Sequence, residues 1–249
     1  MLWFLYKLYS FVIALPLFLV STILTSLTVC LAALFGDKDV VDYYASKCWG
    51  RFTCFIFLLP VHVEGREKLD KKQSYVFLAN HQGYLDIFII YGYLGHNFKW
   101  MMKEYLRKMP FIGFACACTN QIFVGDSRSA IQKAVEQSRQ TLKGGMSMVI
   151  FPEGTRTYDG KMGEFKRGAF MLANEIALPI VPITINGSFD CFSRKARSMS
   201  FGKLSLCVHD PITAEEYQNK PTKVVMKEVF DTINAGVEPK YRISNSQDE

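Results

Sequence analysis

The chain has 249 residues, a hydrophobic fraction of 49% and a formal net charge of +6. This length allows one good-sized domain with an appendage, and the positive charge favours anionic partners such as phospholipid head groups and phosphorylated substrates. Since no finger, recognition helix or aromatic-plus-basic module is recognisable, no nucleic-acid partner is predicted, and the odd, scattered cysteines indicate neither a disulfide framework nor a metal cluster.

The amino-terminal part of the chain has no charged residue between Leu8 and Gly36. This stretch is long enough to cross a hydrocarbon core of about 30 Å and too long for a cleaved signal peptide. Pro16 within it predicts a kink. After a polar break, residues 43–59 are too short and too charged to predict a second span, and suit a helix lying on the first helix or at the interface. Residues 1–60 are therefore predicted to be membrane-associated, either as one spanning anchor or as a helical hairpin in one leaflet.

Residues 61–249 are predicted to form one α/β domain, because short apolar runs alternate with helical patterns. The expected architecture is a mixed, largely parallel sheet flanked by helices. The predicted strands are 61–65, 75–79, 98–102, 121–124, 146–150, 178–185 and 204–208. The strand at 178–185 contains Pro179 and Pro182, which predict a position at a sheet edge or a strand end.

The stretch from Asn80 to Asp86 directly follows the predicted strand at 75–79. On a regular helix, His81 and Asp86 would point about 140° apart. The workable arrangement places His81 in the turn that leaves the strand and Asp86 in the first turn of the next helix. There the carboxylate folds back onto the imidazole and fixes its tautomer. The alternative is a surface histidine that happens to precede an aspartate.

A second polar loop, Phe151 to Thr157, follows the predicted strand at 146–150. Glu153 offers a carboxylate to hydroxyl groups, Gly154 lets the backbone approach a ligand closely, and Arg156 supplies a planar fork for a phosphate. The alternative is that Glu153 and Arg156 pair with each other and brace the loop.

Asn-His-x4-Asp, followed about 70 residues later by Phe-Pro-Glu-Gly-Thr-Arg, resembles the glycerolipid acyltransferase family, specifically its 1-acylglycerol-3-phosphate acyltransferase branch. The resemblance extends over about residues 63–212. It implies that residues 61–249 are the catalytic domain, with His81 as general base and Asp86 as its partner. The residues expected to bind substrate are Lys103, Arg128, Glu153, Gly154, Thr155 and Arg156.

Two basic segments leave alternatives open. At Gly125 to Arg128 the chain departs from the Ile-Phe-Ile-Asp-Arg-like block of the family, since Gly125 and Ser127 are inserted around the acid and the arginine. Arg128 either binds the substrate phosphate or is a surface charge at the start of a helix. The cluster Arg194 to Arg197 with Lys203 is either solvated surface or a dock for membrane phosphates, coenzyme A phosphates or an acidic carrier protein.

The activity implied by the resemblance is transfer of an acyl group to the 2-hydroxyl of lysophosphatidic acid, which gives phosphatidic acid. The donor would be an acyl thioester, acyl-CoA or acyl carrier protein, and no bound cofactor or metal is expected. Because the sequence places no nucleophilic Ser or Cys beside His81, direct transfer without an acyl-enzyme is the simpler mechanism.

Membrane lipids are the expected surroundings, at the cytoplasmic face of a bacterial inner membrane. The alternatives are transfer to another lysolipid, a transacylase that uses a phospholipid donor, and a non-catalytic membrane-anchored lipid-binding protein.

Overall fold

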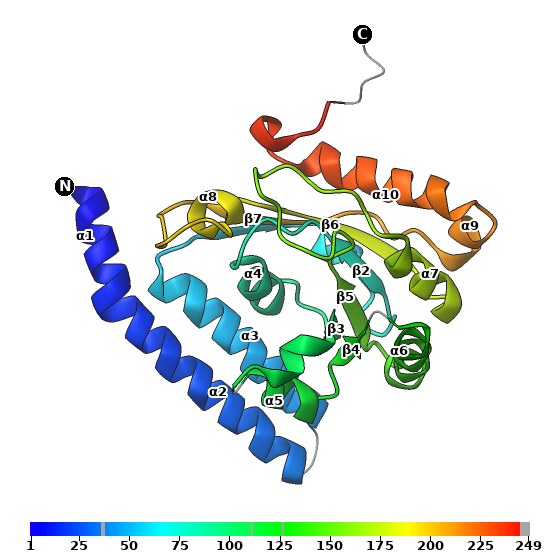
Figure 1. Cartoon of the computed structure of the whole chain (residues 1–249), viewed down its shortest axis with the longest axis horizontal. Coiled ribbons are helices and arrows are strands. Elements are labelled where there is room, and N and C mark those ends of the chain that lie inside the picture. Colours follow the sequence, from blue (N-terminus) through cyan, green and yellow to red (C-terminus); the bar gives the residue numbers. More distant parts are fainter. Residues whose placement is uncertain (36–37, 111, 126, 245–249) are drawn as a thin grey trace.

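The computed structural model describes residues 1–35, 38–110, 112–125 and 127–244, without the side chain of Arg128. Within these ranges a seven-stranded sheet has the order β1-β7-β6-β2-β5-β3-β4 (Figure 1). Its strands are β1 (Val61–Glu64), β2 (Val76–Ala79), β3 (Phe98–Lys103), β4 (Ile122–Val124), β5 (Ser147–Ile150), β6 (Ile180–Asn186) and β7 (Leu204–Val208). The pairs are parallel except β6 with β7, which confirms the predicted mixed, largely parallel sheet.

The proline-bearing strand β6 lies in the interior of the sheet, between β7 and β2, so the first of the two expected positions, a sheet edge, is wrong. Pro179 directly precedes the strand, as the second expected position, a strand end, requires. The carbonyl of Pro182 accepts from His209 N–H at 3.0 Å, so this residue turns its backbone toward β7. Pairing of β6 with β7 begins only at Ile183 with Val208. The missing N–H of Pro182 therefore falls at the end of that ladder, where a central strand tolerates it.

Helices cover both faces of the sheet, as Figure 1 shows for α3 (Lys38–Ile56) and α4 (Asp86–Tyr93) on one side and α6, α7 and α10 on the other. In β2, Phe77 packs with the α3 and α4 side, whereas Leu78 packs with the opposite side. This alternation is the period of a strand buried on both faces. The remaining helices of the domain are α5 (Ile112–Cys118), α6 (Arg128–Thr141), α7 (Arg167–Ile176), α8 (Ser188–Phe192), α9 (Ala214–Gln218) and α10 (Thr222–Gly236), with short turns η2 (Arg66–Lys68), η3 (Glu104–Lys108) and η4 (Pro239–Tyr241).

The amino-terminal segment is a pair of helices that lie side by side (Figure 1). The first runs through α1 (Leu2–Tyr9), the π-helical η1 (Ser10–Ala14) and α2 (Leu15–Phe35), and α3 returns along it. The π-helical turn ends at Ala14, shortly before Pro16, where the sequence predicts a kink. Both π-helical turns and prolines are positions at which helices commonly bend. Across the described residues, Leu2–Phe35 is the single helix that is long and apolar enough to cross a membrane.

Hydrogen bonds fasten the first helix to the second. Tyr6 and Tyr9 each donate a hydroxyl hydrogen bond at 2.9 Å to a carbonyl at the end of α3, which satisfies acceptors that a helix terminus leaves open. The Trp49 indole donates to Thr22 Oγ1 at 3.1 Å. Helix α3 in turn crosses α4 closely at Gly50, where a Cβ would come within 2.6 Å of a carbonyl of α4. The amino-terminal pair is thus continuous with the core of the α/β domain.

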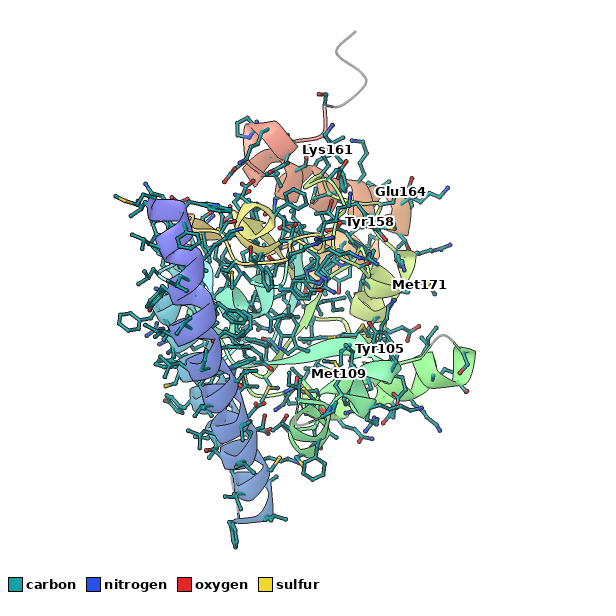
Figure 2. The ribbon with its side chains drawn as sticks, turned by 60° about the vertical axis from the view of Figure 1, so that its left-hand side comes forward. Tyr105, Met109, Tyr158, Lys161, Glu164 and Met171 are labelled. Atoms are coloured by element: carbon teal, nitrogen blue, oxygen red, sulfur yellow. The ribbon has the colours of Figure 1, made fainter. Side chains whose placement is uncertain are left out.

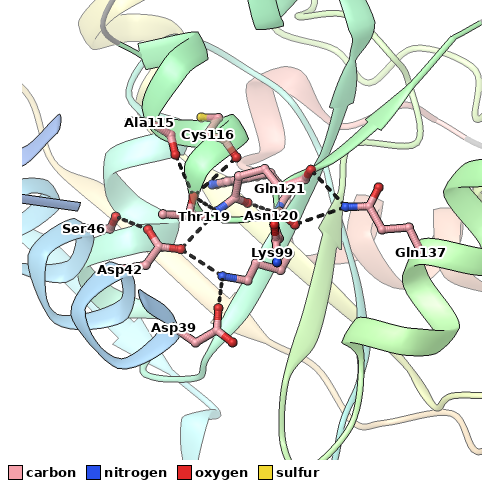
Figure 3. A network of polar contacts seen from close by, with 11 residues as sticks. Asp39, Asp42, Ser46, Lys99, Ala115, Cys116, Thr119, Asn120, Gln121 and Gln137 are labelled. Carbon is pink, nitrogen blue, oxygen red and sulfur yellow. Dashed lines mark hydrogen bonds and ion pairs between the residues drawn. The ribbon is translucent and has the colours of Figure 1, made fainter. Parts of the chain in front are cut away.

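A buried polar network joins α3 to β3 and the start of β4 (Figure 3). Lys99 of β3 is fully buried, and its ammonium lies 3.1 Å from Asp42 Oδ2 and 2.9 Å from Asp39 Oδ1. The Gln121 amide donates to the same Asp42 oxygen at 3.1 Å. Since a charge buried in this way requires a partner, Lys99 specifies the position of α3 against the sheet.

Candidate active site

The predicted site residues meet at one edge of the sheet. Strands β2, β5, β3 and β4 are parallel neighbours, so their carboxyl ends face the same way. The stretch Asn80–Asp86 follows β2, the loop from Phe151 follows β5, and Lys103 ends β3. This edge is where an open α/β sheet presents functional groups.

His81 and Asp86 form the predicted pair. Their Nδ1 and Oδ2 atoms lie 2.6 Å apart, and Asp86, the first residue of α4, is fully buried. The same Oδ2 accepts from Gly83 N–H at 2.9 Å. Because an ionised carboxylate only accepts, Nδ1 carries the proton and Nε2 keeps its lone pair. The His81 side chain remains 15% exposed, so this lone pair is available to a substrate.

Aromatic rings and a buried amide hold the His81 turn in place. The imidazole stacks on Phe151, with ring centroids 3.8 Å apart and planes at 8°, and Phe151 stacks on Trp100 at 5.4 Å. Asn80 donates to Ile185 carbonyl at 2.9 Å and accepts from Ile185 N–H at 2.7 Å, which fastens the end of β2 to β6. The sequence did not identify these supports, because they come from strands β3 and β6 and from the residues that follow β2 and β5.

Glu153 is buried and binds backbone on both sides. Oε1 accepts from His81 N–H and Oε2 from Gly163 N–H, each at 2.7 Å. Burial raises the pKa of Glu153 to about 7, although both N–H donors favour the carboxylate. The structure therefore gives Glu153 a positioning role toward His81, and its contact with a substrate hydroxyl stays a prediction.

Of the other residues in the loop, Gly154, Thr155 and Arg156 are at least partly exposed, whereas Pro152 and Thr157 are buried. Gly154 adopts a φ of +70°, a conformation that glycine allows at no cost, beside Lys166. The Arg156 guanidinium lies 3.7 Å from the centre of the Tyr84 ring, and Thr155 is exposed. Among the described residues no ion pair joins Glu153 to Arg156, so the expected alternative of a mutual brace is not present.

No described contact joins Lys103 or Arg128 to the pair of His81 and Asp86. Lys103 is exposed at the end of β3, past Trp100, the last residue of β3 that pairs with β5. Arg128 begins α6, which is capped by Ser127 Oγ accepting from Ala130 N–H at 3.2 Å. The Arg128 side chain lies outside the described part of the structure. Phosphate binding by both residues stays a prediction.

Metal ligands do not gather in the described ranges, where no group of three His, Cys, Asp or Glu residues could hold a metal ion. The seven cysteines are free thiols spread over the chain. The chemistry that the described side chains offer is proton transfer at His81 beside cationic groups that suit a phosphate.

The chain is similar in sequence to known proteins. The family model described as Acyltransferase matches residues 60–186. The chain is 31% identical over 174 residues to the chloroplastic 1-acyl-sn-glycerol-3-phosphate acyltransferase LPAT1 of Arabidopsis thaliana, over 68% of this chain and 48% of the relative. It is 31% identical over 191 residues to the 1-acyl-sn-glycerol-3-phosphate acyltransferase of Saccharomyces cerevisiae, over 74% of this chain and 62% of the relative. The chain thus spans between about half and two thirds of the length of these relatives.

A solved structure shares the fold over nearly its whole length. The crystal structure of the 1-acyl-sn-glycerophosphate (LPA) acyltransferase PlsC from Thermotoga maritima superposes with a TM-score of 0.78 at 25% identity. The match covers 94% of this chain and 93% of that one, so it includes the amino-terminal helices as well as the sheet.

Proposed function

The chain belongs to the acyltransferase family, and from that premise we propose that it transfers a fatty acyl group from an acyl thioester to the 2-hydroxyl of 1-acyl-sn-glycerol 3-phosphate. The product would be phosphatidic acid. The observation that carries the proposal is the His81–Asp86 pair, which leaves Nε2 of His81 without a described partner, together with Arg156, which stacks on Tyr84 of the same turn. General-base activation of a hydroxyl near a phosphate-binding cation is the chemistry that this acceptor requires.

The reaction follows from the tautomer of His81. Nε2 takes the proton of the acceptor hydroxyl while its oxygen attacks the thioester carbonyl, and Asp86 stabilises the imidazolium that forms. The tetrahedral oxyanion then collapses, the carbon–sulfur bond breaks, and the imidazolium returns its proton to the leaving thiolate. Backbone N–H groups are the expected donors to the oxyanion.

Direct transfer is the mechanism that the contacts support. A covalent acyl-enzyme requires a hydroxyl or thiol nucleophile hydrogen-bonded to the base. In the ranges that the structure describes, the imidazole of His81 contacts Asp86 and Phe151, and no Ser, Thr or Cys donates to it. The acceptor hydroxyl is thus the nucleophile that His81 activates.

The acceptor phosphate is assigned to Arg156 and Lys103. In lysophosphatidic acid the phosphate is attached to the carbon next to the one that carries the reacting hydroxyl, so its cationic partner must lie near His81. Arg156 meets this condition, because it stacks on Tyr84 within the catalytic turn. Its planar fork suits a bidentate contact with phosphate oxygens.

The amino-terminal helices would hold this site at a membrane surface. The outward side of Leu2–Phe35 exposes apolar side chains from end to end, whereas α3 is tied to the sheet through Lys99. This attachment favours a hairpin resting in one leaflet over a single crossing, since α3 cannot leave the domain with the first helix. The cytoplasmic face of a bacterial inner membrane is the proposed location, and holding lipid substrates there keeps the reactants together.

The test is acyl transfer by the detergent-solubilised protein, with lysophosphatidic acid and either acyl-CoA or acyl carrier protein, beside His81→Ala. The wild type should make phosphatidic acid, and the variant should be slower by roughly 10²- to 10⁴-fold, the usual worth of a general base. Equal rates would remove His81 as the base. A wild type inactive with both donors would redirect the assay to other lysolipid acceptors and phospholipid donors, and then to lipid binding alone.

A further inference from the structure

The loop after α8 is attached to the catalytic turn. Ser193 forms an antiparallel bridge with Gly83, and Tyr84 N–H donates to the Phe192 carbonyl at 3.2 Å. The rings of Tyr84 and Phe192 lie 5.0 Å apart. The basic residues that follow, beginning at Arg194, are therefore held beside the active site instead of projecting freely from the surface.

Arg194 is positioned by two contacts with the loop that carries Arg156. Its Nη1 donates to Thr155 Oγ1 at 3.3 Å, and its guanidinium lies 4.4 Å from the centre of the Tyr158 ring. The Lys195 ammonium lies 5.5 Å from the same ring. Arg156 and Arg194 thus each stack on a tyrosine, and neither guanidinium has an ion-pair partner among the described residues.

The proposed reaction brings two phosphates to this edge. One belongs to the acceptor and must lie close to His81. The other belongs to the donor, since coenzyme A and acyl carrier protein both present the acyl group on a phosphopantetheine arm. That phosphate lies at the far end of the arm from the thioester, so its partner belongs on the rim of the site, in water.

Arg194 is the rim cation that meets this description. It is exposed, and it contacts Tyr158, which is itself 55% exposed. Figure 2 shows Tyr158 well separated from Tyr105, with Met171 between them in that view. Since Tyr105 belongs to η3, directly after Lys103, the Arg194 position is distinct from the Lys103 end of the site. Arg194 stacks on Tyr158 and Arg156 stacks on Tyr84, so the two guanidinium groups use different tyrosines and are available to different phosphates.

We propose that Arg194, held by Thr155 and Tyr158 and assisted by Lys195, binds the phosphate of the phosphopantetheine arm of the acyl donor. The inference rests on the proposed function, because it assigns a residue to the second substrate of that reaction. It also explains why the basic loop is anchored to the catalytic turn through Gly83. A stacked guanidinium is restrained before binding, so less side-chain entropy is lost when it meets the phosphate.

The experiment compares Arg194→Ala with the wild type on three donors at saturating lysophosphatidic acid. The donors are a long-chain acyl-CoA, the same acyl group on acyl carrier protein, and its N-acetylcysteamine thioester, which has no phosphate. The KM for both phosphate-bearing donors should rise roughly tenfold, the typical loss of one charge-assisted hydrogen bond. The rate with the N-acetylcysteamine thioester and the KM for lysophosphatidic acid should not change.

Arg197→Ala is the matched control, because Arg197 is an exposed arginine of the same basic segment, and its donor KM should stay at the wild-type value. Tyr158→Ala removes the ring under the guanidinium and should reproduce part of the Arg194→Ala effect.

A loss with only one of the two phosphate-bearing donors would support the anion site and identify which carrier the loop accepts. Two results would overturn the inference: an equal loss with the phosphate-free thioester, or a raised KM for lysophosphatidic acid with the donor KM unchanged. A wild type inactive with all three donors would contradict the proposed function itself, which is a different outcome.

Discussion

Two buried acid–base pairs in this molecule use the same kinds of charge for different purposes. At the end of β2, His81 contacts Asp86 at 2.6 Å. Between β3 and α3, Lys99 contacts Asp42 at 3.1 Å. Both aspartates are buried and each accepts a second hydrogen bond, from Gly83 N–H or from Gln121. Asp42 also accepts from Ser46 on its other oxygen, whereas Oδ1 of Asp86 has no hydrogen-bond partner among the described residues.

The difference lies in the basic partner. The Lys99 side chain is 0% exposed and its ammonium lies between two carboxylates, so nothing is left for a ligand. The His81 side chain is 15% exposed, and its second nitrogen is not used by any described residue. A buried acid–base pair thus contributes to stability alone when the base has no group left for a ligand. It can take part in proton transfer when one nitrogen of the base has no partner in the protein.

The largest effect is expected from Asp86→Asn, which leaves the shape of the acid but removes its charge. The amide does not stabilise the imidazolium and does not select the tautomer with a free Nε2. We expect kcat to fall roughly 10²- to 10⁴-fold, while the KM for lysophosphatidic acid changes little. Steady-state kinetics beside a thermal-unfolding curve measures both quantities. A variant with normal kcat would show that the carboxylate only braces the turn.

Lys99→Met tests the other pair, and its effect should appear in stability. Removing the ammonium leaves Asp42 buried without its cation, so unfolding free energy should fall by about 3 kcal/mol. Activity per folded molecule should be retained. The control is Lys103→Met on the same strand, which removes an exposed lysine and should change stability by less than about 0.5 kcal/mol. If a denaturant titration showed equal losses of unfolding free energy for Lys99→Met and Lys103→Met, the pair of Lys99 and Asp42 would contribute no more to stability than an exposed lysine does.

An effect no larger than that of Lys99→Met is expected from Glu153→Gln, which changes a buried acid whose partners are backbone N–H groups. Its pKa is raised to about 7 from the usual 4.5, so between these pH values the folded state binds more protons than the unfolded state. The contribution of this group to stability therefore falls as the pH rises through that window, by up to about 3 kcal/mol.

The glutamine variant cannot titrate, so its unfolding free energy relative to the wild type should increase from pH 4.5 to pH 7. A constant offset is also expected, because the amide nitrogen cannot accept an N–H hydrogen bond. Denaturant titrations at several pH values separate the pH-dependent difference in unfolding free energy from the constant offset. Parallel pH profiles would show that Glu153 is ionised throughout.

Much of the site could be predicted from the sequence, because its central contact is local. His81 and Asp86 are five residues apart, and the change from an apolar strand to a helix forces the chain to turn between them. The strands likewise follow from short-range patterns of apolar residues, which the structure confirms from β1 to β7. Local periodicity determines such elements before any long-range pairing is known.

The tertiary structure alone decided the contacts between distant segments. Glu153 binds the backbone of a residue 72 positions away, Lys99 pairs with an acid 57 positions away, and Arg194 reaches a threonine 39 positions away. Each depends on which strands are neighbours and in what register. That order emerges from packing both faces of the sheet at once, and it is the reason that Pro182 lies in a central strand. The sequence by itself determined the contact between His81 and Asp86, and the fold determined what holds and surrounds it.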